Sequence, residues 1–142
     1  MLQLLFLASL HLIFLVGAFP PFNLGFLNWF SFIPLFYLIQ KIRYRHLIFW
    51  ALPLTLLINL SLFSWLKDIS SFAHQALAWY FALLYLPTFF LIKLLLNRRL
   101  YYLLPGSLSF LEYLRSLGPY GFPFLTLGYS QYQYPALIQL AD

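Results

Sequence analysis

The sequence contains no cysteine among its 142 residues. This absence excludes disulfide bonds, thiolate zinc sites and a cysteine nucleophile supplied by these residues. Charged residues are also scarce, at 8% of the chain, whereas a soluble domain carries about 25%. Because so few charges cannot coat a water-soluble particle, we infer that lipid surrounds most of the chain.

Apolar residues fill the sequence instead: 63% of the chain is hydrophobic and 23% is aromatic. A membrane-spanning helix needs about 20 predominantly apolar residues, so this length suits four or five spans with short connections. The sequence therefore predicts an all-α, polytopic membrane helix bundle, a single transmembrane domain with four to five transmembrane helices. The predicted spans are residues 2–18, 24–39, 47–66, 76–96 and 100–117, followed by an irregular segment over residues 118–131.

The first apolar run is expected to be a retained span and not a signal peptide. It lacks a basic region in front of it, and no cleavage site of small residues follows it. The sequence continues with Pro20 and Pro21, which end a helix because proline lacks the amide N–H and restricts the residue before it.

Basic residues cluster on alternate sides of the predicted spans, and they give the chain a net charge of +5. On one side lie Lys41, Arg43, Arg45, Lys93, Arg98 and Arg99, against Lys67 alone on the other. Since basic residues collect in cytoplasmic connections, the N-terminus is predicted to be cytoplasmic, and residues 67–75 and 121–123 to lie on the outer face. This placement between apolar runs also explains the positive charge without nucleic acid, so no nucleic-acid partner is expected.

Glu112 and Arg115 are the charged pair inside the fifth apolar run. Residues three apart are neighbours on one face of a helix. Ionisable side chains at membrane depth are costly and usually functional. Of the two interpretations, a structural clamp is favoured over a direct catalytic role.

The segment that follows, residues 121–131, combines two glycines and a proline with several aromatic residues. It predicts irregular backbone, which a membrane tolerates only where protein or a cavity surrounds it. Both an interfacial loop and the wall of an acyl-chain groove fit this composition. Ser130 does not lie in a Gly-x-Ser-x-Gly elbow, the histidines lack metal-ligand spacing, and no glycine-rich phosphate loop is present. No metal and no cofactor are therefore predicted.

Three stretches of the sequence resemble one known family, the N-terminal membrane region of bacterial apolipoprotein N-acyltransferase. They are Ala18-Phe19-Pro20-Pro21-Phe22-Asn23, Phe63-Ser64-Trp65-Leu66, and the block Glu112-x-x-Arg115, Gly121-Phe122-Pro123-Phe124 and Gly128-Tyr129-Ser130-Gln131. Phe124 stands where the family usually has tryptophan. The resemblance implies a structural or lipid-access role, not a catalytic one, for Pro20, Pro21, Phe22, Trp65, Glu112, Arg115, Gly121, Phe122, Pro123, Gly128, Tyr129, Ser130 and Gln131.

The resemblance also implies an activity, a location and partners. Such enzymes of the bacterial inner membrane transfer an acyl chain from a phospholipid to the N-terminal cysteine amine of lipoproteins, using a Glu–Lys–Cys triad in a nitrilase-like domain. The implied partners are membrane lipids, a lipoprotein substrate and a separate nitrilase-like catalytic chain. Because the triad is missing here, the chain is expected to be a truncated or split form that is inactive alone. The alternatives are a non-enzymatic membrane scaffold or lipid-binding module and, disfavoured by the expected lack of buried charge in the first four spans, a small transporter subunit.

Overall fold

The computed structural model describes residues 1–117, 121, 123 and 126–139. The described residues form helices and connecting turns, with no strand among them. The α-helices are α1 (Leu2–Gly17), α2 (Asn28–Lys41), α3 (Tyr44–Leu62), α4 (Ser71–Asn97), α5 (Leu104–Ser116) and α6 (Pro135–Ile138). The short 3-10 helices are η1 (Gly25–Leu27), η2 (Ser64–Asp68), η3 (Tyr101–Leu103) and η4 (Leu127–Gln131). The prediction of an all-α fold is confirmed.

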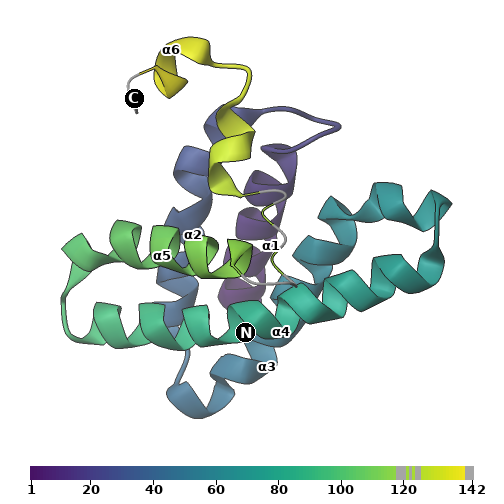
Figure 1. Cartoon of the computed structure of the whole chain (residues 1–142). Coiled ribbons are helices and arrows are strands. Elements are labelled where there is room, and N and C mark those ends of the chain that lie inside the picture. The colour runs from purple at the N-terminus through teal and green to yellow at the C-terminus, as the bar shows by residue number, and fades with distance from the viewer. Residues whose placement is uncertain (118–120, 122, 124–125, 140–142) are drawn as a thin grey trace.

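Consecutive helices pack as pairs, α1 with α2 and α3 with α4, and α5 lies beside α4 (Figure 1). At one end of the molecule, η4 comes back to η1, in the connection that joins α1 and α2, and α6 packs on η4 (Figure 1). The main apolar core joins α2, α3, α4 and the first residue of α5. It consists of Leu35, Leu38, Ile39, Ile42, Leu47, Ala51, Leu54, Ile58, Phe89, Ile92, Leu95, Leu96 and Leu104.

Outside this apolar core, the distribution of side chains differs from that in a water-soluble bundle. Polar side chains on the inner faces of α2, α3 and α4 are buried, while large apolar side chains point outward. The buried polar set includes Ser31, Thr55, Asn59 and Thr88. The exposed apolar set includes Trp29, Ile33, Phe49, Leu57, Leu83, Phe90 and Leu94. Since an exposed apolar surface of this extent would be costly in water, the arrangement suits a lipid environment.

Two helices, α3 and α4, are long and apolar enough to cross a membrane. The 16-residue α1 is apolar but shorter. The 14 residues of α2 and the 13 residues of α5 reach only about 20 Å at 1.5 Å per residue. The number of spans and the side of the N-terminus therefore stay predictions.

Helix α4 begins at Ser71, before the predicted start of the span at residue 76. The Ser70 side chain caps it by accepting a hydrogen bond of 3.2 Å from the Ala73 amide, the role that serine commonly has at a helix N-terminus. The polar residues after Ser70 were expected to form a loop, but this cap makes them the first turns of the helix. The helices also continue through Pro34, Pro53 and Pro87, as membrane helices commonly do.

Lys93 is a buried charge on α4, so the expectation that the first four spans bury none is wrong at this position. Its Nζ donates hydrogen bonds of 2.9 Å to the carbonyl oxygens of Ile39 and Gln40, in the last turn of α2. These carbonyls lie where an α-helix runs out of its own amide donors and where its dipole favours a cation. Lys93 thus ties α4 to the end of α2.

Replacing Lys93 by methionine is expected to destabilise the fold by about 1–3 kcal/mol, because it leaves the two carbonyls without their donor. Lys67→Met is the matched control, since Lys67 is exposed in η2. The midpoint of thermal unfolding in detergent micelles measures the difference. Equal midpoints for the two variants would show that the Lys93 contacts add nothing to stability.

Candidate functional site

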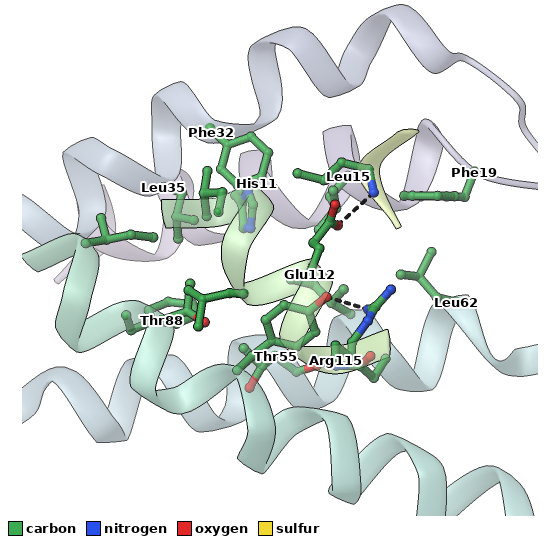
Figure 2. A pocket seen from close by; sticks show the side chains of 18 of the residues that line it. His11, Leu15, Phe19, Phe32, Leu35, Thr55, Leu62, Thr88, Glu112 and Arg115 are labelled. Atoms are coloured by element: carbon green, nitrogen blue, oxygen red, sulfur yellow. Dashed lines mark hydrogen bonds between the residues drawn. The ribbon is translucent and has the colours of Figure 1, made fainter. Parts of the chain in front are cut away.

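An internal cavity of about 90 Å³ lies among α1, α2, α3, α4, α5 and η4. Figure 2 shows Glu112 and Arg115 at this cavity, with His11, Thr55 and Thr88 also on its wall. Most of the other lining residues are apolar, among them Leu15, Phe19, Phe32, Leu35 and Leu62. Thr88 Oγ1 is buried and has no hydrogen-bond partner among the described residues. The cavity is thus an apolar chamber with a few polar groups on its wall.

Glu112 and Arg115 hold α5 to two different neighbours. The Glu112 carboxylate accepts a hydrogen bond of 2.8 Å from the backbone amide of Leu127, the first residue of η4. Arg115 donates to the hydroxyl of Tyr85 on α4, and its guanidinium carbon lies 5.3 Å from the centre of the Phe81 ring. Both hydrogen bonds are drawn in Figure 2. The two charges therefore connect η4, α5 and α4 around the cavity.

Ser130 and Gln131 hold η4 against the start of α2. The Ser130 hydroxyl is buried, donates to the carbonyl of Leu127 at 2.7 Å and accepts from Asn28 Nδ2 at 2.9 Å. Gln131 donates to the Gly25 carbonyl at 2.9 Å and accepts from Trp29 Nε1 at 3.2 Å. Among the described residues, the hydrogen-bond partners of Ser130 are Asn28, Leu127 and Gln131, and none of them is a general base, so this environment is structural and not that of an activated nucleophile.

A second set of polar residues extends this network into α1. The Ser31 hydroxyl donates a hydrogen bond of 2.9 Å to the Asn28 carbonyl. The Ser31 carbonyl accepts a hydrogen bond of 2.7 Å from Nδ1 of the buried His11 ring. Sequence reasoning missed the roles of Asn28 and Ser31. Their spacing of one helical turn, at the start of an otherwise apolar run, was the available signal.

Gly25 allows η1 and η4 to touch. A Cβ atom at Gly25 would lie 2.0 Å from the backbone carbonyl oxygen of Ser130. At Gly128, on η4 itself, a Cβ would meet none of the described residues within 4 Å. The sequence motifs pointed to Gly128, yet the glycine that the contact requires is Gly25, which lies 105 positions before Ser130.

The remaining predicted site residues lie at the edges of this network. Pro20, Pro21 and Phe22 form the exposed turn after α1, and Trp65 lies in η2 with 47% of its surface exposed. Pro123, Gly128 and Tyr129 are exposed, and Phe122 lies outside the described residues. Gly121 comes close to the C-terminal end of α5, where a Cβ would lie 2.3 Å from the Ser116 carbonyl oxygen.

A comparison with protein families identifies the family of this chain. The family model of the apolipoprotein N-acyltransferase N-terminal domain matches residues 13–142. The chain belongs to this family. No curated protein and no solved structure gives a match.

Membership confirms the resemblance seen in the motifs of the sequence. The apolipoprotein N-acyltransferase N-terminal domain is a membrane domain, which agrees with the outward-facing apolar side chains. Within this domain, the network from His11 through Asn28 and Ser130 to Glu112 joins α1, α2, η4 and α5. It holds the Gly-Tyr-Ser-Gln stretch of η4 by hydrogen bonds of Ser130 and Gln131, and the side chain of Tyr129 in the same stretch is exposed.

Proposed function

We propose that this chain is the membrane part of a lipoprotein-modifying acyltransferase. In this proposal it lies in a bacterial inner membrane, crosses it several times, and serves transfer of an acyl chain from a phospholipid to the N-terminal cysteine amine of lipoproteins. The observation that carries the proposal is the family match over residues 13–142. The buried hydrogen bonds of η4 support it, since they hold the motif residues of that family in one fixed arrangement.

The role proposed for these residues is positioning and not bond-making. No thioester can form on this chain, because its 142 residues include no cysteine. Glu112 is committed to the Leu127 amide, which suits a residue that orders η4. The Glu–Lys–Cys triad of the nitrilase-like part would supply the nucleophile, the base and the oxyanion donor. The cavity and η4 would then form part of the wall along which the lipid reaches that triad.

Mass spectrometry of lipoprotein N-termini tests this function. Cells depleted of their own acyltransferase would express this chain alone, a nitrilase-like part alone, or both. N-acylated lipoprotein is expected only when both are present, and it should vanish when the nucleophilic cysteine of the nitrilase-like part is replaced by alanine. Acylation with the nitrilase-like part alone would remove the proposed role, and acylation with this chain alone would disprove its dependence on a partner.

The proposed topology places the N-terminus in the cytoplasm, as the basic residues predict. Because the chain has no cysteine, one introduced cysteine is the only residue of the chain that a maleimide labels, and its labelling shows on which side of the membrane it lies. Asp68→Cys, in η2, is expected to react with a membrane-impermeant maleimide in intact spheroplasts. His46→Cys, in the first turn of α3, is expected to react only after permeabilisation. The reverse pattern would invert the topology.

A further inference from the structure

A second hollow lies on the outside of the molecule, between α2 and α5. It is an open groove of about 840 Å³, with the end of α4 and η4 closing parts of it. One side of it is a stripe on α2 that runs from Trp29 through Ile33 and Phe36 to Gln40. The eleven rises between Trp29 and Gln40 extend about 16 Å, which is close to half of the roughly 30 Å thickness of the hydrocarbon core. The groove thus has the length of one lipid leaflet.

The chemistry of the groove changes along its length. Its middle is apolar, with Ile33 and Phe36 on α2 facing Leu108 on α5. Gln40 and Tyr101 line one end, and Gln131 lines the other. An apolar trough with polar groups at its ends fits a molecule with a long hydrocarbon chain and a polar headgroup.

At the end near Gln40, the lining residues are neighbours in the sequence of three basic residues, which we name the rim. Lys41 directly follows Gln40, and Arg98 and Arg99 lie between Leu96 and Tyr101, which both line the groove. All three basic side chains are exposed. The acidic residues that the structure describes lie elsewhere, Asp68 in η2 and Glu112 on the cavity wall. The rim is therefore complementary to an anion.

Arg99 stands where a glycine would be the ordinary choice. It follows the C-cap of α4 with a φ of 58°. The amides of Arg99 and Leu100 bond to the carbonyls of Leu96 and Leu95, at 3.2 and 2.9 Å, which is the Schellman pattern that usually takes glycine at this position. An arginine at this position is unfavourable for the backbone, because a positive φ suits glycine and not residues with a Cβ. It adds a second guanidinium to the rim.

We propose that this groove binds an anionic glycerophospholipid, with its phosphate at Lys41, Arg98 and Arg99 and an acyl chain along α2 and α5. Arginine and lysine bind phosphate oxygens through charge-assisted hydrogen bonds. The lipid comes from the leaflet that faces the basic end, and it is bound and not consumed. Binding of this lipid does not require acyl transfer, so a result that contradicts one of the two proposals does not contradict the other.

Native mass spectrometry of the detergent-purified chain, titrated with phosphatidylglycerol or with zwitterionic phosphatidylethanolamine, tests the site. The wild type is expected to retain phosphatidylglycerol preferentially. The double variant Arg98→Gln/Arg99→Gly should bind it roughly tenfold or more weakly, since each basic residue near a lipid surface contributes about 1 kcal/mol. Its folding should be preserved because glycine readily adopts the conformation of Arg99. Arg43→Gln/Arg45→Gln, which removes equal charge at the start of α3, a helix that contributes no residue to the groove, is the matched control.

A third variant separates the groove from the charge. Ser109 is exposed and lines the groove, so Ser109→Trp fills part of it without changing any charge. It should also weaken phosphatidylglycerol binding. Equal retention of the two lipids by the wild type would overturn the proposal. So would full phosphatidylglycerol binding by Ser109→Trp, or an equal loss of binding in the Arg43/Arg45 control.

Discussion

Replacing Gly25 by alanine is expected to detach η4 from the start of α2. The new methyl group would lie 2.0 Å from the Ser130 carbonyl oxygen, far inside van der Waals contact. Neither atom can move away by a side-chain rotation, because the backbone fixes the position of both. Overpacking of this kind typically costs about 1–3 kcal/mol and occasionally more. The hydrogen bond from Gln131 to the Gly25 carbonyl should be lost with the contact.

Hydrogen–deuterium exchange of the purified chain measures this detachment at residues 126–131. Gly25→Ala should lose protection there, while Gly128→Ala should keep it, because a Cβ at Gly128 meets no atom within 4 Å in the part of the chain that the structure describes. The pair adds the same methyl group to two helices that touch each other. Unchanged protection in Gly25→Ala would mean that the close approach of η1 and η4 does not hold η4 in place.

Glu112 is the second position with a large expected effect. Glu112→Ala removes the acceptor of the Leu127 amide, and a buried donor left without its partner costs about 1–3 kcal/mol. Glu112→Gln keeps an oxygen at that position, so it should retain most of the stability and most of the acyl transfer measured with a nitrilase-like partner. Thermal unfolding in micelles and lipoprotein mass spectrometry are the two readouts.

The glutamine variant distinguishes positioning from chemistry. A carboxylate that transfers a proton cannot be replaced by an amide, whereas one that accepts a hydrogen bond can. If Glu112→Gln folds like the wild type but abolishes acyl transfer, the positioning role proposed for Glu112 is wrong.

The all-α fold could be predicted from the sequence because long apolar runs with few charges have few alternatives in a membrane. The prediction was less accurate at helix ends. The start of α4 depends on one serine hydroxyl at Ser70, and the end of α2 is completed by Lys93, which comes from another helix. A local sequence pattern can in principle reveal the Ser70 cap. The contact of Lys93 with α2 can be predicted only if it is known that α2 and α4 are neighbours.

The residues of the candidate site could also be predicted only in part. Glu112, Ser130 and Gln131 were found because they form a recognisable motif, and the structure places all three in one hydrogen-bonded network. Gly25 and Asn28 were missed because their importance arises from contacts with residues more than a hundred positions away. Trp65 belongs to the motifs, yet it does not line the cavity, whereas its neighbour Phe63 does.

In the function proposed above, this chain supports acyl transfer by holding η4 in place for a catalytic part outside these 142 residues. The most direct test is mass spectrometry of lipoprotein N-termini in acyltransferase-depleted cells that express the nitrilase-like part with wild-type, Gly25→Ala or Gly128→Ala chains at equal membrane levels. N-acylated lipoprotein is expected with the wild type and Gly128→Ala, and only the diacyl form with Gly25→Ala. Full N-acylation with Gly25→Ala, in a chain whose η4 has lost its protection from exchange, would show that acyl transfer does not require η4 to be held in place.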